Sequence, residues 1–282
     1  QANIMSNEFL EKVARTAAFS RHFELETFRR IQQKQITGPV YLSAGQEYIS
    51  ATVSAMAVEA GLQPNIFIQH RGHSTYLSFG GDPQALIDEL LGKASGCAKG
   101  MGGSASIHSP AINLFGHDGL MGSHVPIAVG SCYATGIPTI VFMGDAAAEE
   151  DYVLGALGWA STKRLPILFV VEDNDLSILT KKSARRNWAM ENVATAFNMK
   201  AAGIPDDPEI MRSTIAKLLP NGLCSEPCLL NITTHRMFWH AGAGIDDEVF
   251  DRHKSIVSAM GQQGQVIDDE EKHRVAMIWK NA

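Results

Sequence analysis

Two short runs of β-branched and other apolar residues mark the middle of the chain. Residues 139–143 (Thr-Ile-Val-Phe-Met) and 167–171 (Ile-Leu-Phe-Val-Val) are too short and too continuously apolar for amphipathic helices, so each predicts a buried strand. Residues 148–163 lie between them and are rich in Ala and Leu, which suits a crossover helix. The pattern therefore predicts a strand-helix-strand unit whose two strands run parallel.

The rest of the chain continues this alternation without an internal repeat or a clear linker. Helices are expected at 6–35, 45–60, 83–93, 119–136, 208–219 and 267–280, and further strands at 65–69 and 228–233. Residues 96–116 are rich in Gly and Ser and too long for a simple connector, which favours a functional or partner-contacting loop. We expect one α/β domain over residues 1–282, in which a central, mostly parallel sheet is flanked by helices and preceded by a helical extension.

Composition agrees with one sizeable core and argues against several classes of partner. The 282 residues are 45% hydrophobic and 19% charged, and the formal net charge is −6. An acidic chain without a basic, aromatic-interleaved patch is not expected to bind nucleic acid or an anionic membrane surface. No apolar run is long enough to span a membrane, no signal peptide is recognisable, and the four cysteines form no Cys-x-x-Cys pair. Reduced thiols and a cytoplasmic location are the expectation.

Polar residues follow both central strands at the point where each is expected to end. Asp145 comes directly after the first strand, and Asn174 lies shortly after the second. The carboxyl ends of parallel strands share one edge of a sheet, where ligands bind in open α/β folds. A carboxylate, an amide oxygen and the backbone carbonyl of Leu176 would suit Mg²⁺, with a diphosphate completing its shell. The alternative is that these are ordinary polar residues at strand ends.

Several ordered blocks resemble one family. The 29-residue separation of Asp145 and Asn174 (174 − 145) is similar to the thiamine diphosphate signature, although Ala146 replaces a glycine and Asp173 an asparagine. Further matching blocks are residues 41–47, 70–73, 96–104, 119–126 and 234–236 with His240. Together, over about residues 10–275, they resemble the alpha subunit of thiamine-dependent 2-oxo acid dehydrogenases. The resemblance implies a three-layer thiamine diphosphate-binding fold.

The family pattern also identifies the residues expected at the diphosphate. Arg71 is the best side-chain ligand, because a guanidinium presents a planar donor fork to phosphate oxygens, although a structural arginine is the alternative. His70 stands where the family often has tyrosine and can still donate to phosphate. The strand end at Gly144 and the backbone amides of Ala146 and Ala147 would face the same group. The methyl group of Ala146 is expected to weaken binding or to open the loop slightly.

Four further residues are assigned to the rest of the cofactor and to the reaction. Backbone groups of Gly119 and Met121 would contact the aminopyrimidine ring, unless the Gly-rich turn serves packing alone. His73 and His240 match the two histidines of the family blocks, and each could orient a 2-oxo acid, stabilise an oxyanion or move a proton. A histidine outside such blocks is more often structural.

The resemblance implies a second chain. In the family, the glutamate that activates thiamine diphosphate comes from a beta subunit, and no glutamate of this chain lies in a block that matches it; those considered are Glu47, Glu149, Glu150 and Glu172. The cofactor is therefore expected at an interface, this chain alone is expected to be inactive, and an α2β2 heterotetramer is the expected assembly.

Three functions fit these features. The first is decarboxylation of a small 2-oxo acid with transfer of the acyl unit to a lipoyl group. The second is a carboligase that joins the acyl unit to an aldehyde or ketone. It is favoured by Phe238, which replaces a family histidine, and by the bulk of Trp239, which make the expected active-site mouth more apolar. The third is a non-catalytic scaffold whose site has degenerated, which is suggested by Ala146 and Asp173.

Overall fold

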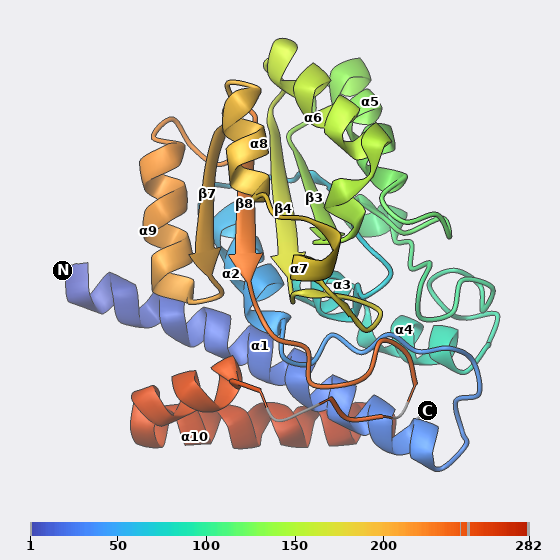
Figure 1. Cartoon of the computed structure of the whole chain (residues 1–282). Helices are drawn as coiled ribbons and strands as arrows, with labels where there is room; N and C mark the ends of the chain where they lie inside the picture. Colours follow the sequence, from blue (N-terminus) through green and yellow to red (C-terminus); the bar gives the residue numbers. More distant parts are fainter. Residues whose placement is uncertain (1, 243, 247–248, 281–282) are drawn as a thin grey trace.

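The computed structural model describes residues 2–242, 244–246 and 249–280, and six parallel strands form its centre (Figure 1). The sheet order is β2-β1-β3-β4-β8-β7. Its strands are β1 (Asn65–Phe67), β2 (Leu114–Phe115), β3 (Thr139–Gly144), β4 (Ile167–Asp173), β7 (Lys200–Pro205) and β8 (Cys228–Thr233). A separate antiparallel hairpin joins β5 (Leu176–Ser177) to β6 (Thr180–Lys181). The expected parallel sheet is confirmed.

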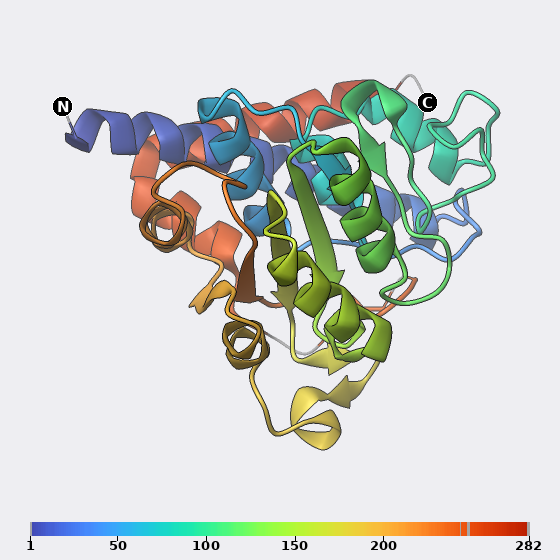
Figure 2. The same ribbon diagram turned by 90° about the horizontal axis from the view of Figure 1, so that it is seen from above.

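Helices cover both faces of this sheet. They are α1 (Ala2–Gln32), α2 (Glu47–Glu59), α3 (His73–Ser78), α4 (Pro83–Leu90), α5 (His124–Thr135), α6 (Asp151–Thr162), α7 (Lys182–Arg185), α8 (Met190–Ala196), α9 (Pro208–Leu218) and α10 (Arg252–Trp279). The two long helices α1 and α10 lie side by side (Figures 1 and 2). Within the described residues, no helix is both long and apolar enough to cross a membrane.

Alternating side chains of the strands build two cores, one on each face. On β3, Ile140 and Phe142 pack with α1, α2 and α9, whereas Val141 and Met143 pack with α5, α6 and α8. All four side chains are fully buried, as expected of a strand covered on both faces. This arrangement confirms the predicted three-layer architecture.

The register of β3 and β4 fixes where the polar residues lie. Gly144 pairs with Glu172 in the parallel ladder, so Asp145 and Asn174 both lie just beyond the carboxyl ends of their strands. The crossover between them is the 3₁₀ turn Ala147–Glu149 followed by α6. The predicted strand-helix-strand unit is therefore present, with the expected shared edge.

Some elements were not expected from the sequence. The strand β7 contains Lys, Ala and Gly, and β2 has only two residues, so neither shows a continuous apolar run. The helix α10 begins well before the predicted segment 267–280 and bends sharply at Gly261, which has φ 59° and ψ −132°. The prediction captured only the arm beyond that bend.

The Gly-rich stretch after α4 folds around one buried carboxylate. Glu89, at 1% exposure, accepts four backbone N–H bonds of 2.8–2.9 Å, from Ala98 and Gly100 to Oε2 and from Gly102 and Gly103 to Oε1. Charge-assisted bonds of this kind are stronger than neutral ones. Part of the predicted functional loop is thus held in place by an internal anion.

We predict that Glu89→Gln destabilises the chain by roughly 2–4 kcal/mol, because an amide nitrogen would face backbone donors in a buried site. Urea unfolding measures the loss, and hydrogen exchange should show faster exchange in residues 96–104. The control Glu226→Gln removes an exposed ion pair with Lys200 and should change stability by less than about 0.5 kcal/mol. Equal stability of the two variants would contradict this account of the loop.

Candidate active site

A cavity of about 160 Å³ lies at the carboxyl edge of the sheet, where β1, β3 and β4 end. It gathers most of the residues predicted from the sequence. Those lining it are His70, Arg71, Met121, Gly144, Asp145, Ala146, Ala147, Asn174, Leu176 and His240, together with Gln69, Ser177 and Ile178. Segments separated by up to 171 residues (240 − 69) thus meet because parallel strands deliver their following loops to one edge.

Arg71 is a buried cation bound to carbonyl groups. Its Nη1 donates to the carbonyl of Leu42 at 2.9 Å and its Nη2 to that of His240 at 3.1 Å. Among the described residues, no carboxylate forms a direct ion pair with this guanidinium, and burial lowers the pKa of Arg71 to about 10, although Glu172, Glu24 and Asp246 act against this shift from a distance. A buried charge without a counter-ion is costly. The cavity wall is therefore suited to an anion.

Two histidines beside Arg71 are neutral at physiological pH. Burial, followed by the charge of Arg71, lowers the pKa of His70 to about 2, and both ring nitrogens of His70 are buried without a partner. Burial and the charges of Arg71 and Arg236 lower the pKa of His240 to about 4. A neutral imidazole has one N–H donor and one acceptor. Both rings can therefore donate to a ligand, and neither adds a full positive charge.

Asp145, the predicted metal ligand, is paired with Arg185 from α7. The Arg185 guanidinium donates to its carboxylate, and Arg186 Nη1 donates to its backbone carbonyl at 2.9 Å. Burial raises the pKa of Asp145 above its usual value, although Arg185 opposes this shift. The Nε and Nη1 atoms of Arg185 are buried without a hydrogen-bond partner. A cation at Asp145 would therefore compete with Arg185 for the carboxylate, and Arg185 brings unused donors to this region.

Asn174 is oriented by its neighbours. Its Nδ2 donates to Gln46 Oε1 at 2.8 Å, and its Oδ1 accepts the backbone N–H of Leu176 at 3.1 Å. The oxygen keeps a second lone pair for a metal. Asp173, which replaces the first asparagine of the family signature, does not line the cavity; it binds Lys182 and accepts from Asn231 Nδ2 at 2.9 Å.

Two predicted residues lie outside the cavity. His73 is fully buried, with Nδ1 3.0 Å from Glu24 Oε2 and Nε2 2.8 Å from Ser104 Oγ. Because both ring nitrogens are engaged and His73 does not line the cavity, its geometry favours a positioning role. Gly119 occupies an exposed turn with φ +104°, where a glycine is favoured, and only its neighbour Met121 lines the cavity.

One expectation about substitutions needs correction, whereas the effect of the Ala146 methyl group on binding stays a prediction. Ala146 has φ −77° and ψ −37°, the ordinary right-handed helical region, so its backbone conformation does not require glycine. Phe238 does not line the mouth of the site; it is buried and stacks on Phe28 with ring centroids 4.6 Å apart. Trp239 is 55% exposed, so it alone of this pair can contribute to an apolar entrance.

Three residues that matter here were missed from the sequence. Gln69 lines the cavity and donates to the buried Glu172, Gln46 orients Asn174, and Arg185 pairs with Asp145. None has a local signal, because each acts through a partner far away in the chain. The block 41–47 contains Gln46 and was the only hint.

The donor set fits a magnesium diphosphate. The unpartnered ring nitrogens of His70 and the positive charge of Arg71 suit phosphate oxygens, while Asp145, Asn174 and the carbonyl of Leu176 offer the hard oxygens that Mg²⁺ prefers. The volume is below the roughly 300–1,000 Å³ typical of sites that enclose a whole small molecule. This cavity therefore suits one end of a cofactor.

Comparisons with known proteins identify the family. The family described as "Dehydrogenase E1 component" matches residues 15–276. The chain is 27% identical to the pyruvate dehydrogenase E1 component subunit alpha of Zymomonas mobilis, covering 84% of this chain and 68% of the relative. The mitochondrial counterpart from Dictyostelium discoideum is 28% identical, covering 77% of this chain and 60% of the relative. The subunit alpha of Rickettsia prowazekii is 32% identical, covering 57% of this chain and 50% of the relative. The chain thus spans between half and about two thirds of these relatives.

A solved structure supports the fold alone. Transketolase from Leishmania mexicana superposes with a TM-score of 0.60 at 15% identity, covering 96% of this chain and 46% of that one. It confirms the expected α/β architecture.

We predict that Glu172 makes stability decrease as pH rises. Burial raises its pKa from 4.5 to about 7, so its contribution is fully present below the ordinary pKa and is lost as pH rises through the raised one. Glu172→Gln imitates the protonated form. From about pH 5 to about pH 7.5, it should therefore lose less unfolding free energy than the parent, by on the order of 2 kcal/mol. Identical pH dependence in urea unfolding would contradict this.

Proposed function

Because this chain belongs to the dehydrogenase E1 component family, we propose that it is the alpha-type subunit of a heteromeric enzyme that decarboxylates a 2-oxo acid and transfers the acyl unit. The named function of its pyruvate dehydrogenase relatives supports this choice. In the proposal, the chain binds the diphosphate end of thiamine diphosphate with Mg²⁺. A beta-type subunit supplies the activating glutamate in an α2β2 assembly.

The observation that carries the proposal is the charge arrangement of the cavity. A buried guanidinium without a carboxylate partner, Arg71, lines the same small space as a carboxylate, Asp145. Arg71 and His70 would donate to the diphosphate, together with the amides of Ala146 and Ala147 at the start of the 3₁₀ turn. The carboxylate would hold the metal that neutralises the diphosphate from the other side.

Metal binding requires a local exchange of cations. Asp145, Asn174 Oδ1 and the carbonyl of Leu176 would hold Mg²⁺, and Arg185 would leave the Asp145 carboxylate to admit it. Arg185 and Mg²⁺ would compete for the single negative charge of this buried carboxylate. The guanidinium released in this way would have donors for the incoming diphosphate. Cofactor and metal should therefore bind together more tightly than either alone.

The chemistry is divided between the cofactor and the protein. When bound, thiamine diphosphate supplies the carbanion that attacks the keto carbon of the substrate. The neutral His240 can donate to the substrate carboxylate or move a proton, and Gly119 and Met121 would position the aminopyrimidine ring through their backbone groups. His73 would act indirectly, by fixing the loop at Ser104.

The glutamates of this chain support the need for a partner. Glu47 pairs with Arg21, Glu149 with Arg186, and Glu172 accepts from Gln69. These three carboxylates therefore serve contacts within the chain. An activating carboxylate from a second chain is consistent with this use.

Acyl transfer is preferred over carboligation. The proposal of a carboligase rested on an apolar mouth, and the burial of Phe238 removes half of that argument. The relatives are named as dehydrogenase components, which favours a lipoyl acceptor over an aldehyde or ketone. A hydroxyketone as the product of the assembled enzyme would reverse the preference.

We predict that Asp145→Asn abolishes metal-dependent cofactor binding. Calorimetric titration of thiamine diphosphate with Mg²⁺ into the co-expressed two-chain complex should show affinity lower by roughly 100-fold or more, because the amide lacks the charge for Mg²⁺. The control Asp151→Asn changes an exposed carboxylate at the start of α6 and should bind like the parent. Unchanged affinity in Asp145→Asn, with the assembly intact, would sink the proposed metal site.

A second prediction concerns the diphosphate. Arg71→Lys keeps the positive charge and loses the planar fork, so affinity for thiamine diphosphate should fall roughly 10- to 100-fold. The same titration measures it. Arg164→Lys serves as the control, because Arg164 lies on the exposed connection that precedes β4, at the end of the strand opposite to the cavity. Equal affinities for these two variants would show that Arg71 is only structural.

A further inference from the structure

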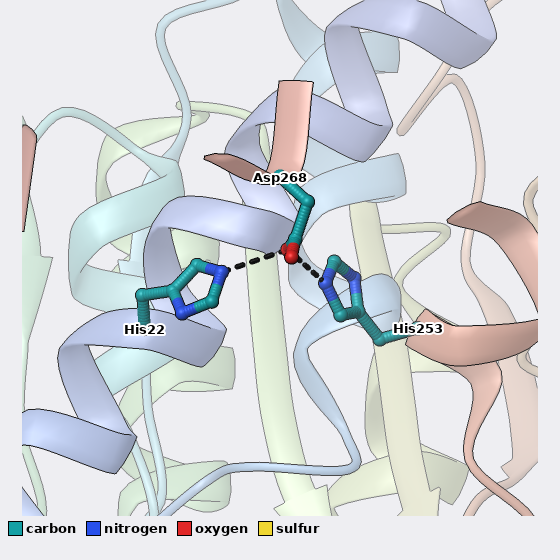
Figure 3. A group of neighbouring side chains, drawn as sticks. All are labelled: His22, His253 and Asp268. Carbon is teal, nitrogen blue, oxygen red and sulfur yellow. Dashed lines mark hydrogen bonds and ion pairs between the residues drawn. The ribbon is translucent and has the colours of Figure 1, made fainter. Parts of the chain in front are cut away.

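Three side chains converge away from the cavity, between α1 and α10 (Figure 3). His22 comes from the middle of α1, His253 from the first turn of α10, and Asp268 from α10 beyond its bend. Both histidine Nε2 atoms lie 2.7 Å from the same carboxylate oxygen, Asp268 Oδ1. The three ligand atoms all lie within 4.8 Å of one another. This cluster has no part in the proposed active site.

The bend of α10 is what creates the cluster. In a straight helix, residues 253 and 268 would be about 22 Å apart along the axis. Gly261 reverses the chain with a positive φ, and at Gly264 an added Cβ would lie 2.4 Å from the carbonyl oxygen of Val257. Two glycines thus allow the short first arm to fold back against the long second arm. This reversal of the helix brings His253 into contact with Asp268.

The cluster is sheltered and has a supporting contact. The side chains of His22, His253 and Asp268 are 13%, 7% and 20% exposed. The other ring nitrogen of His253, Nδ1, lies 3.1 Å from the Tyr48 hydroxyl. A hydroxyl can donate or accept, so Tyr48 can serve either tautomer of His253. Ligand histidines commonly have such a partner on their second nitrogen.

The surrounding charges favour a cation. Arg21 lies between two carboxylates, 2.5 Å from Glu47 Oε1 and 3.0 Å from Asp251 Oδ1, so that one positive charge faces two negative ones. Asp268 adds a further carboxylate, in contact with both imidazoles. Carboxylates of Glu47, Asp251 and Asp268 thus contact two adjacent residues of α1, Arg21 and His22.

We propose that His22, His253 and Asp268 bind one divalent transition-metal ion of the Zn²⁺ class and so clamp α1 to both arms of α10. Two imidazole nitrogens and one carboxylate suit Zn²⁺ or Co²⁺ and do not suit Mg²⁺. Tetrahedral bonds of about 2.0–2.1 Å place ligand atoms about 3.3 Å apart, slightly wider than the present 2.7 Å contacts. Small side-chain rotations provide that space. Three protein ligands leave one position for water.

The test is Co²⁺ titration of the untagged 282-residue chain after removal of metals by chelation. We expect one Co²⁺ per chain, visible as ligand-field absorption that Zn²⁺ displaces and excess Mg²⁺ does not. At about 100-fold excess over its Kd, Zn²⁺ should raise Tm by roughly 5 °C. No uptake by the parent chain would overturn the proposal, and so would displacement by Mg²⁺.

Matched variants locate the ion. His22→Gln and Asp268→Asn should each weaken Co²⁺ binding by about 100-fold or more, and Tyr48→Phe by about 10-fold, through the contact with His253. His273→Gln changes an exposed histidine on the same arm of α10 and should bind like the parent. Circular dichroism without metal confirms that each variant is folded. Undiminished binding by folded His22→Gln, or loss of binding in His273→Gln, would refute the assigned ligands.

Discussion

Burial of Arg71 without a carboxylate partner is the constraint on which the candidate site depends. The guanidinium is held by two backbone carbonyls, from Leu42 and His240, which tie two distant loops to the end of β1. Carbonyl groups orient a cation but do not neutralise it. The parallel sheet places this guanidinium, which has no direct carboxylate partner, beside Asp145 and Asn174 at one edge. A diphosphate with a bound Mg²⁺ would suit both sides of the cavity, because its oxygens would face Arg71 and its metal would face Asp145.

Arg185 explains how the chain can fold before such a ligand arrives. Asp145 is buried, and its pKa would rise further without a nearby positive charge. Arg185 provides that charge from α7, a short helix connected to the exposed β5–β6 hairpin. A charge supplied by a short surface element can be exchanged for a metal ion more easily than one fixed in the core. The site therefore combines a rigid wall at Arg71 with an exchangeable one at Arg185.

Local signals predicted the parts of the fold that local sequence determines. Continuous apolar runs identified β3, β4 and β8, and polar residues at their ends identified Asp145 and Asn174. The strand β7 was missed because its covered position is set by neighbours and not by its own Lys, Ala and Gly. The pairing of Arg185 with Asp145, the contacts of His73 with Glu24 and Ser104, and the bend of α10 at Gly261 depend on contacts between distant segments. Single-sequence patterns do not record such contacts.

The most direct test is a crystal structure of the two-chain complex with thiamine diphosphate and Mn²⁺ in place of Mg²⁺, using anomalous scattering to locate the metal. The account predicts one anomalous peak bounded by the Asp145 carboxylate, Asn174 Oδ1 and the Leu176 carbonyl. It also predicts the diphosphate against Arg71, with Arg185 moved off Asp145. A metal peak elsewhere, or Arg185 still paired with Asp145 while cofactor is bound, would contradict it.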